Sequence, residues 1–351
     1  MSFIEIVGGK QLFGEINVQG SKNAVLPILA ATVLIRGTTK INHCPRISDV
    51  FNMLYILEDI GCKVWWEDST VYVDAKYLTS ITVPEKYVNQ MRASITFLGS
   101  IIGRMHNVSV SLPGGCSIGK RPIDLHLKSL RSMNITIDEV GDMLHCTTDK
   151  IIGTDIFLRS PSVGATENII LAATLANGVT RIYNAAMEPE VVELCLFLRE
   201  AGARIKGLGT DRITIEGVKH LRSIEHTLSS DRIVTGTYMA MVASAGGDVI
   251  FKGVDSNDIL SVLHALAQMG CNISCGEDYV RVCNDKRPKA IPFIETKPYP
   301  LFPTDMQSQI IAALSVADGT SCVVENMFED RYGAAEELRK LGANIDRKSV
   351  V

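Results

Sequence analysis

The chain lacks the features that mark several large classes of protein. Its nine cysteines are scattered singly, without the paired spacing of a zinc knuckle or a disulfide framework, a pattern that fits a reducing cytosol. No segment reaches the ~20 uninterrupted apolar residues of a membrane span, and the first residues lack a basic run followed by a long apolar core. The net charge of −4 argues against nucleic acid as the main partner. We therefore predict a cytoplasmic protein that binds neither nucleic acid nor membrane, and its 351 residues suffice for two or more domains.

A repeated pattern is the strongest signal of structure in the sequence. Helices are expected to end in the motif Leu-x-x-φ-Gly-(Cys/Ala)-x-(Val/Ile), where φ is apolar or Ala. The motif itself begins at residues 57, 198, 266 and 338, and a degenerate copy begins at 130 with Asn134 in place of the glycine. The spacings along the chain are 73, 68, 68 and 72 residues. Asn is the next-best residue after Gly for a left-handed helix terminus, so we expect this position to end the helix in all five copies.

A second element precedes each of these helices. It is an Ala-rich apolar helix, then a glycine (Gly37, Gly103, Gly178, Gly247 or Gly319), then an alternating strand. Further strands are expected at residues 70–73, 212–216 and 279–282. Such units cannot bury an apolar face alone, so the pattern predicts an α/β assembly of units packed on one another.

The stretch Leu112–His126 combines a cysteine with glycines and cations. Three glycines free the backbone around Cys116, while Lys120 and Arg121 bring positive charge close to its sulfur. A mobile cationic loop of this kind suits a lid over an anionic substrate. The alternative is a glycine-rich turn that holds an inert cysteine.

Several helix starts carry residues that suit anion binding or proton transfer. Lys22 follows the expected N-cap Ser21, in a first turn where the helix dipole disfavours a cation unless an anion shares the site. The guanidinium of Arg92 also suits phosphate or carboxylate, and the backbone donors of the helix start at Ser162 suit a phosphate or a sugar hydroxyl. Asp305 is a candidate general base. The alternatives are a solvated surface position for Lys22, a capping or surface role for Arg92 and capping alone for Ser162. For Asp305 the alternative is a favourable first-turn acid beside a Thr304/Gln307 capping box.

Eight segments together resemble the enolpyruvyl transferases, and among them those that act on UDP-N-acetylglucosamine. They occur in the family's order along nearly the whole chain, and the cysteine loop followed by Pro-Thr-Asp-Met-Gln is the most specific match. The segments are Gly20–Pro27, Met91–Ser94, Leu112–His126, Ser162–Thr166, Asn184–Glu190, Asp231–Gly236, Phe302–Gln307 and Glu325–Arg331.

The resemblance implies two inverse α/β barrels built from repeated βαβαββ units, with the active site in the cleft between them. We expect the first barrel at residues 22–228, and the second at 1–21 plus 229–351. The implied reaction transfers the enolpyruvyl group of phosphoenolpyruvate to the 3-hydroxyl of UDP-N-acetylglucosamine, releases phosphate, and needs no metal or organic cofactor. It opens peptidoglycan precursor synthesis.

The resemblance also implies roles for single residues. Cys116 matches the family's proton donor, which can hold phosphoenolpyruvate covalently and is the target of fosfomycin. Lys22 and Arg121 match contacts to phosphoenolpyruvate, and Asp305 matches the residue that takes the proton of the attacking hydroxyl. The positions that match contacts to the nucleotide sugar or other substrate groups are Asn23, Arg92, Pro122, Ile123, Asp124, Leu125, Ser160, Pro161, Ser162, Val163, Gly164 and Met327. Glu188, Asp231 and Arg232 match positions expected near the cleft.

The sequence contains five units, whereas the resemblance implies six. The sixth would follow Val351, supply a further cleft arginine and close the second barrel, so we expect an open apolar face and strand edge in its absence. Two alternatives to the implied activity are an enolpyruvyl transferase acting on shikimate phosphate, and a silent relative that binds nucleotide sugar without turnover.

Overall fold

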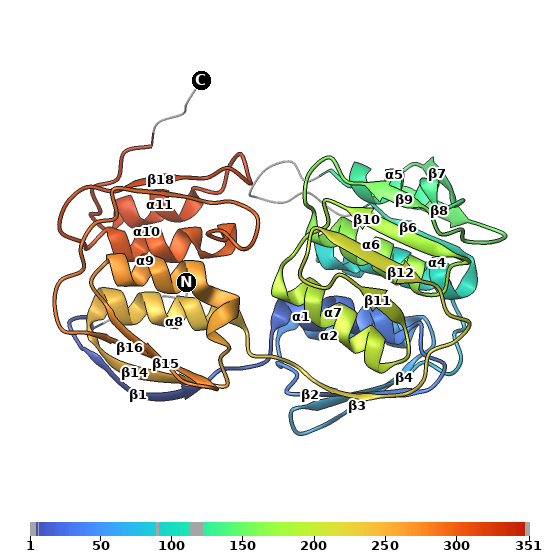
Figure 1. Cartoon of the computed structure of the whole chain (residues 1–351), viewed down its shortest axis with the longest axis horizontal. Helices are drawn as coiled ribbons and strands as arrows, with labels where there is room; N and C mark the ends of the chain where they lie inside the picture. Colours follow the sequence, from blue (N-terminus) through green and yellow to red (C-terminus); the bar gives the residue numbers. More distant parts are fainter. Residues whose placement is uncertain (1–4, 6, 89–90, 113–121, 348–351) are drawn as a thin grey trace. The chain divides into compact units, whose positions relative to one another are not determined.

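Residues 5, 7–88, 91–112 and 122–347 are described by the structure, a computed structural model of the chain. They form two compact units, which we call the large unit and the small unit. The large unit contains the described residues from Gln19 to Ser229. The small unit contains the described residues up to Val18 and those from Ser230 onward. In Figure 1 the dark-blue strand β1 (Leu12–Asn17) therefore lies with the orange and red elements.

Three four-stranded sheets with one common strand order build the large unit. In each sheet the first two strands pair in parallel and the other neighbours pair antiparallel. The last strand of the unit, β13, pairs with β2, so the end of the unit returns to its beginning. The sheets, in strand order, are β13 (Glu225–Thr227), β2 (Thr38–Asn42), β4 (Thr70–Asp74) and β3 (Lys63–Glu67); β5 (Thr82–Val83), β6 (Asn107–Ser111), β8 (Met143–Thr147) and β7 (Thr136–Val140); and β9 (Asp155–Phe157), β10 (Val179–Tyr183), β12 (Arg212–Glu216) and β11 (Arg204–Lys206).

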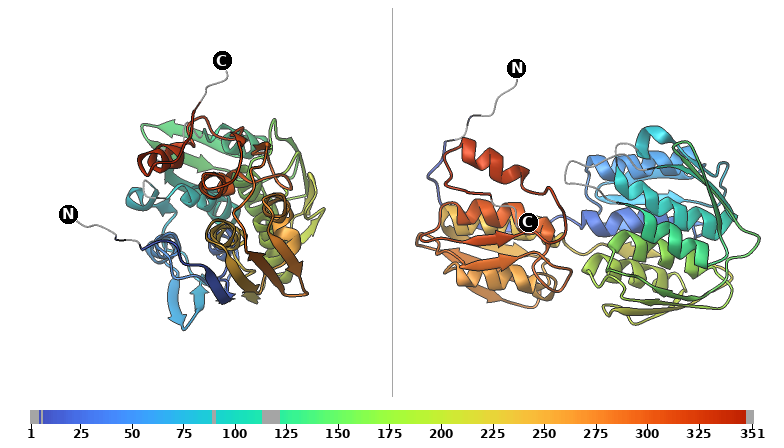
Figure 2. Two further views of the ribbon diagram at one scale, coloured as in Figure 1. Left: turned by 90° about the vertical axis from the view of Figure 1, so that its left-hand side faces the viewer. Right: turned by 90° about the horizontal axis from the view of Figure 1, so that it is seen from above.

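Three almost wholly buried helices form the centre of the large unit. They are α1 (Lys22–Thr32), α4 (Thr96–Met105) and α6 (Val163–Thr174), and α4 packs on both of the others. A helix that is apolar all round must be surrounded by other elements, which explains why the Ala-rich segments lie here. Figure 2 shows the blue, cyan and green helices of this unit side by side. The remaining helices are α2 (Ser48–Asp59), α3 (Glu85–Val88), η1 (Arg92–Ile95), α5 (Asp124–Ser132) and α7 (Pro189–Glu200).

The small unit repeats the same sheet once and adds a parallel strand pair. Its four-stranded sheet has the order β1, β14 (Gly247–Lys252), β16 (Tyr279–Asn284) and β15 (Asn272–Cys275), and β17 (Phe293–Glu295) pairs with β18 (Cys322–Val324). The amino-terminal strand β1 pairs in parallel with β14 along its whole length. The helices are α8 (Arg232–Ala245), η2 (Ser256–Ile259), α9 (Leu260–Gln268), η3 (Thr304–Met306), α10 (Gln307–Leu314) and α11 (Gly333–Lys340).

The repeated helix ends expected from the sequence are confirmed. Gly61, Gly202, Gly270 and Gly342 have φ angles of 105°, 107°, 96° and 97°, and Asn134 has 67°. All five positions are left-handed, where glycine is favoured and asparagine is tolerated. The strands expected at 70–73, 212–216 and 279–282 are also present, as β4, β12 and β16.

The prediction for Gly103 is wrong, because this residue lies inside α4 rather than between helix and strand. The helix continues to Met105 and ends at His106, which has a left-handed φ of 61°. A Cβ atom on Gly103 would lie 3.2 Å from a methyl of Leu34 and 3.3 Å from the carbonyl oxygen of Leu171. The glycine therefore allows α4 to pack closely against α6 and against the turn that follows α1.

Within the described ranges, no helix is both long and apolar enough to span a bilayer. The eight cysteines that the structure describes are all free.

Candidate active site

The start of α1 is positioned by backbone contacts. The Ser21 amide donates to the carbonyl of Ser229 at 2.9 Å, and the Ser21 hydroxyl accepts from the Ala24 amide at 3.3 Å, which confirms the predicted N-cap. A Cβ atom on Gly20 would lie 1.9 Å from the carbonyl oxygen of His43, so only glycine fits there. These contacts fix the position of Lys22 as the first residue of α1.

Lys22 and Asn23 both contact acidic side chains. The Lys22 ammonium lies 3.7 Å from the carboxylate of Asp49 on α2, and both side chains are partly exposed. The Asn23 amide donates to Glu190 on α7 at 3.5 Å. An exposed ion pair of this length contributes little stability, so the ammonium can turn toward an anionic ligand.

Glu190 belongs to a group of three acidic side chains with Glu167 and Glu188, and sequence reasoning had assigned no role to Glu167. Glu167 on α6 is buried, and burial raises the pKa of its carboxyl well above the ordinary value, with Glu190 and Glu188 raising it further. Burial disfavours the charged form, and neighbouring carboxylates act in the same direction. The one available signal for Glu167 was a single acid within an otherwise apolar helix.

The start of α6 is capped by Ser162, whose hydroxyl accepts from the Ala165 amide at 3.4 Å. Capping, the alternative explanation of this serine, therefore does occur. The helix has twelve residues and no acid in its first turn, so its amide groups and dipole favour an anion at this end.

The structure places the predicted substrate segment Pro122–Leu125 against Arg159, the residue directly before the second predicted segment, Ser160–Gly164. The guanidinium of Arg159 lies 2.9 Å from the carboxylate of Asp124. Arg92 reaches the same region, since its Nη2 donates to the carbonyl of Pro122 at 3.4 Å.

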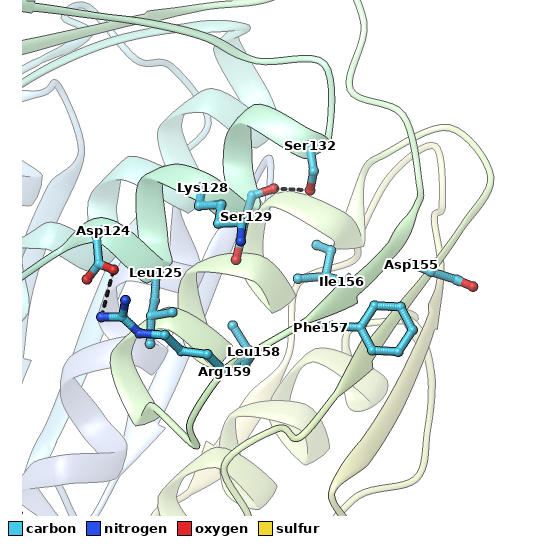
Figure 3. Close-up of a pocket in the computed structure, with 10 residues that line it drawn as sticks. All are labelled: Asp124, Leu125, Lys128, Ser129, Ser132, Asp155, Ile156, Phe157, Leu158 and Arg159. Atoms are coloured by element: carbon cyan, nitrogen blue, oxygen red, sulfur yellow. Dashed lines mark hydrogen bonds and ion pairs between the residues drawn. The ribbon is translucent and has the colours of Figure 1, made fainter.

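A cavity of about 280 Å³ lies between α5 and the β9 segment, beside these residues (Figure 3). Arg159 extends toward Asp124 at its edge, and the aliphatic side chains of Leu125, Ile156 and Leu158 make part of its wall. This volume suits one part of a nucleotide sugar rather than the whole molecule. The lining residues are Asp124, Leu125, Lys128, Ser129, Ser132, Asp155, Ile156, Phe157, Leu158 and Arg159.

In the small unit, Asp305 is held by an arginine that sequence reasoning had not singled out. The Arg331 guanidinium donates to the Asp305 carboxylate at 2.7 Å. The Thr304 hydroxyl donates to Glu325 at 2.9 Å, and η3 has no side-chain cap, so the alternative of a Thr304/Gln307 capping box is wrong. Arg331 lies 26 residues after Asp305, a separation that carries no local sequence signal.

Met327, the predicted substrate residue nearest to this group in the chain, is exposed. Its amide donates to Glu325 at 2.8 Å. The predicted residues Cys116 and Arg121 lie outside the described residues, and so does Lys120.

Comparison with known proteins gives the family. Residues 6–350 match the family described as EPSP synthase (3-phosphoshikimate 1-carboxyvinyltransferase). The chain is 46% identical over 345 residues to UDP-N-acetylglucosamine 1-carboxyvinyltransferase 2 of Caldanaerobacter subterraneus subsp. tengcongensis, covering 98% of this chain and 83% of that protein. It is 44% identical to UDP-N-acetylglucosamine 1-carboxyvinyltransferase 1 of Carboxydothermus hydrogenoformans, covering 98% of this chain and 81% of that protein.

Solved structures confirm the predicted fold class. The enolpyruvyl transferase NikO from Streptomyces tendae matches with a TM-score of 0.84 and 21% identity, over 95% of this chain and 80% of that one. An EPSP synthase from Acinetobacter baumannii matches with a TM-score of 0.67 and 20% identity, over 91% of this chain and 75% of that one. The chain therefore belongs to the enolpyruvyl transferase family, among the UDP-N-acetylglucosamine 1-carboxyvinyltransferases.

Proposed function

We propose that the protein transfers the enolpyruvyl group of phosphoenolpyruvate to the 3-hydroxyl of UDP-N-acetylglucosamine and releases inorganic phosphate. This reaction is the first committed step of peptidoglycan precursor synthesis. The observation that carries the proposal is 46% identity, over 98% of the chain, to a relative named UDP-N-acetylglucosamine 1-carboxyvinyltransferase 2. We also propose a cytosolic location, where thiols such as the eight free cysteines stay reduced.

The transfer adds the sugar oxygen to the carbon that bears the phosphate and a proton to the neighbouring carbon. The bond from the first carbon to the phosphate oxygen then breaks, phosphate leaves, and loss of a proton from the new methyl group restores the double bond. We assign Asp305, whose carboxylate is oriented by Arg331, as the acceptor of the proton that the sugar hydroxyl loses in the first step. We assign Cys116 as the proton donor to phosphoenolpyruvate, on the resemblance of its loop. Lys22 and Arg121 bind phosphoenolpyruvate, because their cations match its phosphate and carboxylate.

The nucleotide sugar is assigned to the surface of the large unit formed by α5 and the start of α6. Support comes from the ion pair of Asp124, in the first predicted segment, with Arg159, which directly precedes the second, and from the cavity beside it. Asn23, Arg92 and Met327 complete the proposed set of substrate contacts.

An assay with two acceptors tests the proposal. The purified protein is given phosphoenolpyruvate with either UDP-N-acetylglucosamine or shikimate 3-phosphate, and phosphate release is measured. We expect release with the nucleotide sugar alone. Release only with the shikimate compound would assign the chain to the other branch of the family.

A further inference from the structure

One carboxylate in the small unit is bonded to two segments that carry proposed site residues. Glu325 directly follows β18, and its two oxygens accept hydrogen bonds from different parts of the chain. One oxygen accepts from the Thr304 hydroxyl at 2.9 Å, and the other accepts from the amides of Met327 at 2.8 Å and Phe328 at 3.1 Å. An ionised carboxylate is an acceptor only, so three donors converge on one fixed group.

The first oxygen reaches the proposed proton acceptor through the backbone. Thr304 begins the short helix η3, and Asp305 is the next residue. Since η3 has no side-chain cap of its own, the bond from Thr304 to Glu325 ties the turn that carries Asp305 to the segment after β18. A hydrogen bond to a charged acceptor is stronger than one between neutral groups, which makes this a firm anchor.

The second oxygen reaches the partner of the proton acceptor. The guanidinium carbon of Arg331 lies 5.4 Å from the centre of the Phe328 ring, a distance at which a cation and a ring face attract each other. Arg331 in turn donates to Asp305 at 2.7 Å. The amide of Glu325 also donates to the hydroxyl of Tyr332, the residue after Arg331, at 2.9 Å. Glu325 therefore holds the segment that carries Arg331 as well as the turn that carries Asp305.

We propose that Glu325 is a positioning residue for the proton transfer, because it fixes the Asp305 turn and the Arg331 segment relative to each other. This inference rests on the proposed function. Glu325 acts through Thr304 and Arg331 rather than on the substrate. The alternative is a carboxylate that only stabilises its own loop by accepting from the amides two and three residues later. The two roles differ in one consequence, since only the first makes the rate depend on the Thr304 hydroxyl.

A double-mutant cycle on turnover separates the two roles. Glu325→Gln removes the charge and keeps the shape, and Thr304→Val removes only the hydroxyl. Each should lower kcat for phosphate release roughly 10- to 100-fold, because a small displacement of the base slows the reaction. The double variant should lose no more than the larger single change, because both act on one contact. Thr304→Ser keeps the hydroxyl and most of the turnover, and the control Glu337→Gln, on the exposed side of α11, should leave kcat unchanged.

A second cycle tests whether the effect passes through the base. In Asp305→Asn the proposed proton acceptor is already lost, so adding Glu325→Gln should change the remaining turnover by roughly a factor of two or less. Thermal unfolding and calorimetric binding of UDP-N-acetylglucosamine show which variants are folded. If Glu325→Gln does not fold, the comparison of Thr304→Val with Thr304→Ser decides alone, and equal turnover in the two overturns the inference.

The inference is also overturned if Thr304→Val has the kcat of the wild type, or if the losses of the two single variants multiply in the double variant. A loss from Glu325→Gln that is as large without Asp305 as with it would have the same meaning. These outcomes leave the proposed function intact, since they require an active wild-type protein. A wild-type protein that releases no phosphate contradicts the proposed function, and this inference with it.

Discussion

The two groups of predicted catalytic residues are positioned in different ways. Lys22 is placed by backbone, through the Ser21 to Ser229 hydrogen bond and the contact of Gly20 with the His43 carbonyl. Asp305 is placed by a side chain, the guanidinium of Arg331. The first group should therefore tolerate changes of neighbouring side chains but not of Gly20, while the second should depend on individual polar groups.

The largest effect should come from the carboxylate itself. Asp305→Asn removes the proposed base, so turnover should fall roughly 10²- to 10⁴-fold, while the affinity for UDP-N-acetylglucosamine stays unchanged. Steady-state phosphate release and calorimetry measure the two quantities. The control is Asp330→Asn, an exposed acid that pairs with Arg347 at 3.1 Å and should leave turnover unaffected. Similar losses of turnover in both variants would contradict the assignment of Asp305 as the base.

A change at Gly20 should act mainly on the stability of the fold rather than on the catalytic reaction. Gly20→Ala places a Cβ atom against the His43 carbonyl, so the free energy of unfolding should fall by about 2–4 kcal/mol, as measured by urea denaturation. The matched change Gly333→Ala is at the start of α11, where a Cβ atom meets nothing within 4 Å. It should be neutral or stabilising by at most about 1 kcal/mol. Equal effects would show that backbone contact does not hold the start of α1.

A substitution at Lys22 distinguishes the loss of a specific contact with phosphoenolpyruvate from a general loss of surface charge. In Lys22→Gln the KM for phosphoenolpyruvate should rise roughly 10- to 100-fold, because a hydrogen bond to a charged group is lost. Lys40→Gln removes a cation that pairs with Glu225 at 2.8 Å on a sheet surface, and should leave the KM unchanged. If the Lys40 change raised the KM as much, overall charge rather than position would be the cause.

The smallest effect concerns the strand that closes the large unit. His226 on β13 forms a hydrogen bond with Glu200 at 2.8 Å, and its Nε2 lies 3.5 Å from the carboxylate of Glu193. Burial lowers the pKa of His226, but the two carboxylates outweigh this and raise it. Because the folded pKa exceeds the unfolded value of ~6.5, this stabilisation is present below that pH and is lost as pH rises through the folded pKa.

His226→Gln should therefore lower the free energy of unfolding by about 1–2 kcal/mol at acidic pH and by less at higher pH. Denaturation curves across this range measure the difference, with the exposed His220→Gln as control. A difference that grew as the pH rose would contradict the assignment.

The structural features that could be predicted from the sequence are those that depend on residues adjacent in the chain. The left-handed helix ends, including Asn134, follow from local backbone preference, and so does the Ser21 cap. The interior position of Gly103 did not follow, because it depends on Leu171 on α6 and on Leu34 in the turn after α1.

The site shows the same limit. The contacts of Arg331 with Asp305 and of Glu325 with Thr304 join residues 26 and 21 positions apart, and neither residue of either pair indicates its partner. The barrel limits expected at 22–228 and at 1–21 plus 229–351, and the roles of Cys116 and Arg121, stay predictions.

The most direct test of the proposed activity separates binding from turnover on the same sample. UDP-N-acetylglucosamine is titrated by calorimetry, phosphoenolpyruvate is then added, and the nucleotide sugar is analysed by mass spectrometry. We predict saturable binding followed by an enolpyruvyl adduct of the sugar and an equal amount of phosphate. Tight binding with no adduct and no phosphate would contradict the proposed activity and would identify the chain as a relative that only binds the nucleotide sugar.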